Sequence, residues 1–362
     1  MLEVASPSLP PAVLHSATAI LFLLLLRAVM KTPHASGRLL LLIVWLRYVM
    51  QAYHEITYTT VGGISINAIG SLAVCGVGAI VLARQLGGIG RFPIVLALLI
   101  VIVISGLING AIVPAVETLL KWGYFVIVML AVQDCIRRDG DARILGLLLW
   151  AFAPPLIYQG LSIGLGVSKA TESDGSVSYI GGYNHEAAFS IVLVTCFAVA
   201  SLAPRINPVA RIVLLAACFA GIFAANYRTS LIALAPLAFG FFVFGIARGA
   251  GHGRGIIVSL IGLMGMAGGP VVANMVMADR LSDLNTVASE TGDLVRPPEE
   301  FTEAERRLLS GRLYVWNQYI DEYSSGSDKQ LLFGFGPDSW IERFGLYAHN
   351  PIVSYRYEFG LA

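Results

Sequence analysis

The sequence predicts an all-α, polytopic membrane protein: a bundle of about ten transmembrane helices with a large external loop near its C-terminal end. Three observations lead to this fold class. The chain of 362 residues is 56% hydrophobic and only 13% charged, whereas a soluble protein of this length needs far more charged surface. It contains ten long apolar runs, and its basic residues are concentrated in alternate connections between them.

Each apolar run can approach or cross a hydrocarbon core of about 30 Å. The runs lie near residues 10–30, 38–53, 64–84, 92–109, 112–133, 143–165, 185–203, 208–225, 229–247 and 254–276. The first one lacks the small-residue cleavage site of a signal peptide, so we expect it to span. Prolines at 114, 154, 155 and 236 fall inside runs and should kink or open the helices there.

Sidedness follows from the basic residues, because Lys and Arg collect in the cytoplasmic connections. Alternate connections hold 12 of the 24 basic residues, whereas the short connections between them hold only Lys169 and Arg228. The basic connections should therefore face the cytoplasm, and parity places the N-terminus and residues 277–349 outside. The basic set is Arg27, Lys31, Arg38, Arg84, Arg91, Arg137, Arg138, Arg143, Arg205, Arg211, Arg248 and Arg254.

Glu117 and Lys121 lie within an apolar run, where charge is expensive unless it is paired or hydrated. They are four residues apart, so they share one helix face, with Glu in the favourable N-terminal position. A structural ion pair and a functional cavity are both compatible with this spacing. The four cysteines, at 75, 135, 196 and 218, have no zinc-like spacing and are expected to be packing residues. No metal site or cofactor is predicted.

Two short outward connections carry candidate binding residues. Arg228 lies in a tight turn before an apolar run, where a guanidinium and the N–H groups of a helix start can bind an anion together. Thr229 or Ser230 could cap that helix. In YIGGYNHEAAFS, Asn184 could cap the next helix, with His185 and Glu186 in its first turn. We expect the two connections to line one site, although an interfacial Arg and ordinary helix-start residues would look the same.

The outer loop predicts an amphipathic helix. Thr302 and Glu305 have capping-box spacing. Apolar residues then recur at 309, 313, 316, 320 and 323, which forms one helical stripe. Arg312 lies four residues before Trp316, at the edge of this stripe. The helix would lie on the membrane or over the mouth of the bundle, with Arg312 in a site or merely solvated.

Two further motifs follow in the loop. In GFGPDSW, Gly334 and Gly336 permit a tight turn. His349 and Asn350 then precede Pro351, which is typical of the first turn of a helix. A histidine titrates near neutral pH and can take a proton from a hydroxyl group. Each motif alone is weak, so the argument rests on their order and on their common predicted side.

The order resembles the O-antigen ligase and polymerase superfamily (Wzy_C-type proteins), which includes lipopolysaccharide ligases, surface polysaccharide polymerases and protein O-glycosyltransferases. The resemblance covers about residues 180–362, and the first half agrees only in being a helical bundle. The matching segments are YRTSLIA (227–233), SGRLYVWNQ (310–318), LFGFGPDSW (332–340) and HNP (349–351), followed by YRYEFGLA.

The resemblance implies a GT-C-like membrane glycosyltransferase. It would move a glycan from an undecaprenyl-diphosphate donor to a glycan, lipid A-core or protein acceptor, at the outer face of the bacterial inner membrane and without a metal or nucleotide cofactor. Arg228 and Arg312 would hold the donor diphosphate, and His349 would activate the acceptor hydroxyl. Lys121 would contact the donor more deeply, and the remaining candidates for substrate binding are His185, Glu186, Asn350 and Trp316.

The resemblance also shapes the expected division of the chain. Residues 1–276 would form the transmembrane bundle, and 277–349 the periplasmic loop with the catalytic motifs. Residues 350–362 would begin a further transmembrane helix that is cut short here, because members of the superfamily continue with more spans. The lipid bilayer is an expected partner and nucleic acid is not.

Two other functions fit parts of the sequence. A transporter or flippase for a polysaccharide or glycolipid could use the same buried charges, but such proteins commonly carry inverted repeats. We find no internal repeat, and transport does not require a long outer loop with Arg and His. A non-catalytic subunit of an envelope-polysaccharide machine is the third interpretation.

Overall fold

The computed structural model describes residues 8–62, 64–170, 177–241, 296–303, 305–306 and 311–360. The chain divides into two units: the first combines residues 1–86 with 126–271, and the second combines 87–125 with 272–362. Helix α7 (Ile112–Asp139) passes from the second unit into the first. The described residues are mostly helical with very few strands, which confirms the all-α class.

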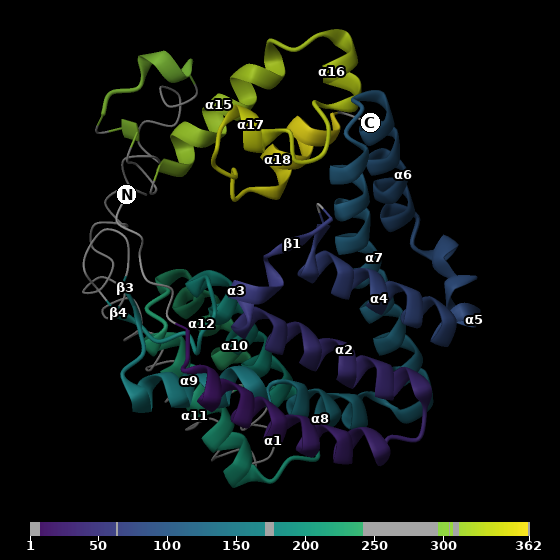
Figure 1. The fold of residues 1–362 in the computed structure, drawn as a ribbon, viewed down its shortest axis with the longest axis vertical. Helices are drawn as coiled ribbons and strands as arrows, with labels where there is room; N and C mark the ends of the chain where they lie inside the picture. Colours follow the sequence, from purple (N-terminus) through teal and green to yellow (C-terminus); the bar gives the residue numbers. More distant parts are fainter. Residues whose placement is uncertain are drawn as a thin grey trace, which may run out of the picture. The chain divides into compact units, whose positions relative to one another are not determined.

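The first unit is a helical bundle (Figure 1). Two short antiparallel hairpins, β1–β2 and β3–β4, lie in its connections. Its elements are α1 (Pro11–Met30), α2 (Ala35–Ala52), α3 (His54–Thr57), β1 (Thr60–Val61), β2 (Ile64–Ser65), α4 (Ile66–Val81), α5 (Ala83–Leu86), α8 (Asp141–Ala151), α9 (Ala153–Leu165), β3 (Lys169–Ala170), β4 (Val177–Ser178), α10 (Glu186–Leu202), α11 (Pro208–Ala224) and α12 (Arg228–Gly240).

The second unit joins the described part of the polar loop to an apolar helix. Its helices α15, α16 and α18 contact one another, and α16 and α18 also contact α6. Besides the first part of α7, its elements are η1 (Ile89–Arg91), α6 (Pro93–Ile108), η3 (Pro298–Glu300), α15 (Arg312–Ser324), α16 (Asp328–Phe333), α17 (Trp340–Arg343) and α18 (Pro351–Phe359).

Helices occupy the predicted apolar runs as far as the structure describes them, and the run at 254–276 lies outside the described residues. Three helical segments are long and apolar enough to cross a membrane: Pro11–Met30, Ile112–Asp139 and Asp141–Leu165. Other apolar helices, such as α4 and α6, have 16 residues. At about 1.5 Å per residue they fall short of a 30 Å core. Membrane association is therefore supported, and the ten-span topology stays a prediction.

The core of the first unit is apolar and aromatic. Tyr158, Phe189 and Leu193 are fully buried within it. The third candidate span is interrupted at Phe152, where α8 ends and α9 begins with Pro154 and Pro155 in its first turn. The predicted opening at these prolines is confirmed, because a proline ring is accommodated at a helix start but not in its interior.

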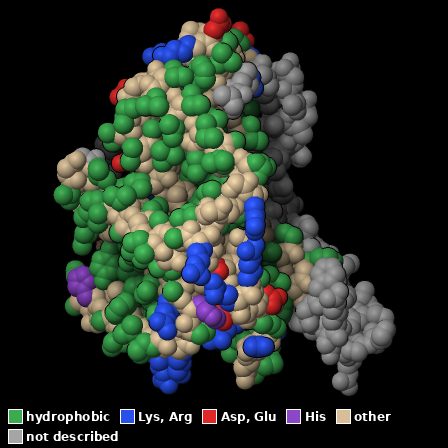
Figure 2. Space-filling view, turned by 90° about the vertical axis from the view of Figure 1, so that its right-hand side faces the viewer, with side chains coloured by type: hydrophobic (Ala, Val, Ile, Leu, Met, Phe, Trp, Pro, Cys, Tyr) green, Lys and Arg blue, Asp and Glu red, His purple; other side chains and the backbone are tan. Residues whose placement is uncertain are grey.

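Three of the basic connections meet near the N-terminal end of α2. His34, just before α2, lies 3.2 Å from Asp139 at the end of α7, and Arg143 lies 3.7 Å from the same carboxylate. Gln85 of α5 donates to Asp134 at 2.7 Å. Figure 2 shows Lys and Arg side chains gathered together with acidic ones among them. Three connections predicted for one side of the membrane therefore meet in one place.

Connections that are predicted for the opposite side of the membrane lie close together near the C-terminal end of α2. The buried His54 ring bonds to the carbonyl of Gly182 at 3.0 Å, and the Tyr183 hydroxyl donates to the carbonyl of Tyr48 at 2.7 Å. The N–H of Tyr179 donates to Ala224 at 2.9 Å, just before the turn into α12. This arrangement agrees with the alternation read from the charges. The compartment that each end faces, and the division of the chain at residue 276, stay predictions.

Candidate functional site

The closing segment folds around buried aromatic side chains. Tyr319, Tyr323 and Tyr357 are at most 4% exposed and pack with Ala348. The rings of Tyr319 and Phe344 stack with centroids 4.1 Å apart. We call this group the aromatic cluster. Stacked rings and their buried area stabilise a segment with few aliphatic residues, and the cluster fixes the loop on which His349 lies.

His349 is held through its neighbours. The indole N–H of Trp316 donates to the carbonyl of Ala348 at 2.6 Å. On the other side, the Asn350 side chain accepts the N–H of Ile352 at 3.0 Å and caps α18, which begins with Pro351 as predicted. The exposed His349 lies between them with φ of 51°, in the left-handed region that few non-glycine residues adopt. Its ring meets the Tyr347 ring edge-on, with centroids 5.6 Å apart.

Arg312 lies on the same helix as Trp316. It is the first residue of α15, one turn before Trp316, and it is exposed. A single turn of helix therefore links Arg312 to the indole that holds the backbone beside His349. Of the predicted site residues, Trp316 bonds to the residue before His349, Asn350 caps the helix after it, and Arg312 begins the helix that carries Trp316. Trp316 and Asn350 have positioning contacts there, which the sequence did not predict.

The predicted loop helix needs two corrections. The capping box is confirmed, since the Thr302 N–H donates to the Glu305 carboxylate at 2.8 Å. However, α15 begins only at Arg312, after Gly311 with φ of 77°. The predicted stripe also fails at one position, because Ile320 is 44% exposed whereas Tyr319 is fully buried, and Tyr323 is buried as predicted. Tyr319 can be buried because its hydroxyl donates a hydrogen bond to the carbonyl of Leu346 at 2.9 Å. An isoleucine has no such donor.

The Gly334–Gly336 turn packs against the end of α18. The N–H groups of Phe335 and Gly336 donate to the carbonyls of Tyr357 and Glu358 at 2.9 and 3.0 Å. Gly334 has φ of 70°, and a Cβ there would collide with the Glu358 carbonyl oxygen. The tight turn is thus confirmed, and glycine is required because two backbones meet without room for a side chain.

Glu358 is a candidate site residue that sequence reasoning missed. Its side chain lies in the second unit, is only 5% exposed, and accepts the N–H of Asp338 at 3.0 Å. Burial raises the pKa of this carboxyl to about 7; the N–H of Asp338 and the charge of Lys121 act in the opposite direction. The available signal was an acidic residue in the aromatic-rich run YRYEF. A carboxyl that titrates near neutral pH is a common feature of functional sites.

Of the two interpretations of Glu117 and Lys121, the structural ion pair is not found among the ion pairs of the described residues. The charge of Lys121 acts on an acid of another element, because it lowers the pKa of Glu358 against the larger effect of burial. Lys121 itself is exposed. Its predicted contact with a lipid-linked diphosphate stays a prediction.

The remaining predicted residues lie in the first unit. His185, not Asn184, caps α10: its Nδ1 accepts the N–H of Ala187 at 3.1 Å. Glu186 pairs with Lys169 at 3.2 Å. Arg228 is the first residue of α12, so Thr229 and Ser230 lie inside the helix and do not cap it. The side chain of Arg228 lies outside the described residues. Convergence of this set with His349 and Arg312 stays a prediction, because the two units are described separately.

Three of the nominated motifs share one backbone feature. Among the described residues, the non-glycine residues with positive φ are Asn226, Asp338 and His349, at 51°, 56° and 51°. Asn226 lies two residues before Arg228, Asp338 lies in GFGPDSW, and His349 is the candidate base. Left-handed backbone at non-glycine residues persists only where the surroundings enforce it, and it concentrates at functional sites. Three of the predicted motifs therefore contain or adjoin a residue whose backbone is held in the left-handed conformation.

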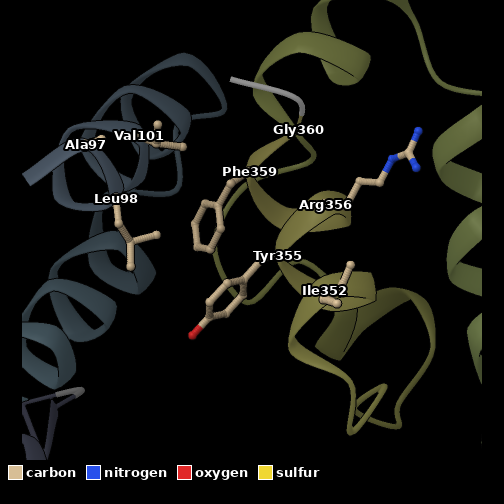
Figure 3. Close-up of a pocket in the computed structure, with 8 residues that line it drawn as sticks. All are labelled: Ala97, Leu98, Val101, Ile352, Tyr355, Arg356, Phe359 and Gly360. Atoms are coloured by element: carbon tan, nitrogen blue, oxygen red, sulfur yellow. The ribbon is translucent and has the colours of Figure 1, made fainter. Parts of the chain in front are cut away.

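An apolar pocket of about 400 Å³ lies between α6 and α18 (Figure 3). Ile352 is the first residue of α18 that lines this pocket, and it is only three residues after His349. The Arg356 side chain extends away from the apolar lining, toward the Tyr323 ring, whose centroid is 5.0 Å from its guanidinium carbon. The apolar lining residues are Ala97, Leu98, Val101, Ile352, Tyr355 and Phe359.

Comparisons of the chain with protein-family models, with curated proteins and with solved structures found no match.

Proposed function

We propose that this protein is a membrane glycosyltransferase of the O-antigen ligase and polymerase type. It moves a glycan from an undecaprenyl-diphosphate-linked donor to an acceptor hydroxyl at the outer face of the bacterial inner membrane. A GT-C-like bundle of about ten spans holds the donor, and the polar loop carries the reacting groups. The acceptor is a growing surface polysaccharide, a lipid A-core or a protein.

The observation that carries this proposal is the setting of His349. A histidine in a left-handed backbone conformation, fixed by Trp316 on one side and by the Asn350 cap on the other, is a preorganised base. Arg312 lies one helical turn from the same tryptophan. Glycosyl transfer from a diphosphate requires a base and an anion-binding group, and His349 and Arg312 are our candidates for these two roles.

In the proposed reaction, His349 takes the proton of the acceptor hydroxyl. The hydroxyl oxygen attacks the anomeric carbon of the donor sugar, and the bond from that carbon to the diphosphate oxygen breaks. The electron pair leaves with the diphosphate, whose growing charge is stabilised by Arg312 and Arg228. A guanidinium suits this role because its planar fork donates two parallel hydrogen bonds to a phosphate.

The surroundings support a substrate with both polar and apolar parts. The apolar pocket between α6 and α18 starts one turn from His349, and its volume of about 400 Å³ is in the usual range for small-molecule sites. A hydrocarbon chain fits its apolar lining. Three helical segments that are long and apolar enough to cross a membrane are consistent with a lipid-linked donor.

The test is transfer by the purified chain in lipid nanodiscs, with lipid-diphosphate glycan as donor and a mixed set of acceptors. Glycan release and product length are both measured. Loss of a general base lowers rates by about 10²–10⁴-fold, so His349→Ala should abolish measurable transfer. His15→Ala is the matched control, because His15 is another exposed histidine, stacked on Tyr53 in the first unit.

Unchanged turnover in His349→Ala, with His15→Ala also active, would overturn the base assignment. Movement of the intact lipid-linked glycan across the bilayer, with neither release nor a new linkage, would favour a transporter instead. Equal loss in both variants, with an unfolded protein by circular dichroism, would call for His349→Asn, which tolerates the same backbone conformation.

A further inference from the structure

A second pocket lies beside α15, on the side of this helix that faces away from the aromatic cluster. Tyr314, Gln318 and Asp321 line it from successive turns of the helix, and its volume is about 410 Å³. At 100° per residue, these side chains are turned well away from Trp316 and Tyr319, which belong to the aromatic cluster. The pocket is therefore distinct from the face of α15 that holds the His349 loop, although both belong to the second unit.

The lining is rich in hydrogen-bonding groups. Carboxylates come from Glu299, Asp321 and Glu322, and guanidinium groups from Arg306 and Arg343. Five charged groups with a formal net charge of −1 offer many donors and acceptors but no excess of positive charge. Such a lining suits a ligand with many hydroxyl groups and disfavours an anionic one.

The two arginines are already engaged within the pocket wall. Both Nε and Nη2 of Arg343 donate to one oxygen of Glu322, at 2.8 and 2.6 Å. The guanidinium carbon of Arg306 lies 5.1 Å from the centroid of the Tyr314 ring. These contacts hold the arginines in place. Glu299, Asp321 and Gln318 are further polar side chains in the lining.

Aromatic side chains complete the wall. Tyr314 and Phe344 are both half-buried and line the pocket. The Phe344 ring stacks on Tyr319, whose hydroxyl donates to the carbonyl of Leu346, three residues before His349. Apolar ring surface beside carboxylate and amide groups matches a sugar, which combines C–H faces with hydroxyl edges. The wall is also connected to the His349 loop through packed side chains.

We propose that this pocket is a glycan subsite selective for neutral or amino sugars over acidic ones. The choice of a glycan as ligand rests on the proposed function, whereas the selectivity rests on the net charge and on the acceptor-rich lining. Because the pocket is on another face of α15 from the His349 loop, it binds a sugar unit remote from the reacting bond. Its contribution is uniform binding, which lowers KM and leaves kcat unchanged.

The test is binding of the detergent-solubilised full chain to a printed panel of neutral, amino and acidic oligosaccharides. We expect retention on neutral or amino members, and at least a tenfold loss of retention in Gln318→Ala/Asp321→Ala. His349→Ala should bind like the wild type, because binding to the subsite does not require the base. Asp328→Asn removes an exposed carboxylate outside the pocket and is the matched control.

A second variant tests selectivity. Glu299→Gln/Asp321→Asn keeps the size and the polarity of the lining, replaces acceptor-only carboxylates by amides that both donate and accept, and changes the formal charge from −1 to +1. We expect retention on acidic oligosaccharides to rise at least tenfold in this variant, with no rise in Asp328→Asn. Retention on the panel by wild type and Gln318→Ala/Asp321→Ala alike, no retention by wild type, or a wild-type preference for acidic sugars would each overturn the proposal.

The two proposals fail separately. If transfer proves independent of His349 while the pocket variants lose retention, the base assignment falls and the subsite stands. If His349→Ala abolishes transfer and the pocket variants bind and react like the wild type, the subsite falls and the catalytic assignment stands.

Discussion

Two histidines of this protein occupy similar places in the sequence and very different places in the structure. His185 and His349 both stand at the start of a helix after a turn. His185 is itself the cap of α10, and its Nδ1 accepts the N–H of Ala187. At His349 the following residue, Asn350, caps α18, and Trp316 holds the residue before it. The difference shows that a helix-start histidine is a candidate base where its neighbours supply the local structure.

The largest expected effect is on the transfer rate, which should depend on His349 and not on His185. Asparagine adopts left-handed backbone readily, so His349→Asn should fold like the wild type while transfer falls by about 10²–10⁴-fold. At position 185, asparagine is a good cap, so His185→Asn should retain folding and most activity. Transfer rates and thermal unfolding of both variants decide the matter. Comparable rates in the two variants would show that His349 is not the base.

The next largest effect is expected at the Gly334 turn, because this turn holds the C-terminal end of α18, the helix that follows His349. Gly334→Ala adds a Cβ against the Glu358 carbonyl, which should cost about 3 kcal/mol, with about 1 kcal/mol more for left-handed backbone. Gly345→Ala is the control: φ there is 66°, but nothing lies within 4 Å of the new Cβ. It should cost only about 1 kcal/mol. Chemical unfolding in detergent measures both, and equal losses would contradict the close backbone contact.

Sequence reasoning predicted the positions of the helices well and the contacts between them poorly. The apolar runs end at Gly, Pro and charged residues, which are local signals, so helices such as α6 and α11 begin and end where expected. The burial of Glu358 could not be predicted, because it depends on a turn some twenty residues earlier in the sequence. Tyr319 displaced Ile320 from the buried stripe because a carbonyl in another loop accepts its hydroxyl.

The pH dependence of stability tests the buried end of α18. The pKa of Glu358 rises from its ordinary value of 4.5 to about 7 in the folded state. Between these values the folded protein binds more protons than the unfolded chain, so stability falls as pH rises from 4.5 to 7. At 1.36 kcal/mol per pKa unit the loss is about 3 kcal/mol.

Glu358→Gln should remove this dependence, because glutamine can still accept the N–H of Asp338 but does not titrate. Glu342→Gln, on the exposed surface of α17, should leave it in place. Unfolding free energies measured at several pH values in one detergent provide the comparison. An equally steep fall in Glu358→Gln would show that another group is responsible.

Trp316 tests the other end of α18. Trp316→Phe keeps an aromatic ring and removes the N–H that bonds to Ala348. Leaving this carbonyl without its partner should cost about 1–3 kcal/mol. If the indole positions His349, kcat should fall more than KM rises, and hydrogen exchange at the N–H groups next to His349 should accelerate. Trp340→Phe is the comparison, because Trp340 packs edge-on against Tyr347 through its ring alone among the described contacts.

The smallest effect returns to His185. His185→Ala removes the side chain that accepts the N–H of Ala187 and should destabilise the protein by about 1 kcal/mol. His185→Asn should restore most of that stability, because its side-chain oxygen can accept the same N–H group. If alanine is harmless to stability but raises KM for the glycan donor, and asparagine does not reverse the KM change, His185 binds substrate as the sequence predicted. The cap and the binding role are then separated by one pair of variants.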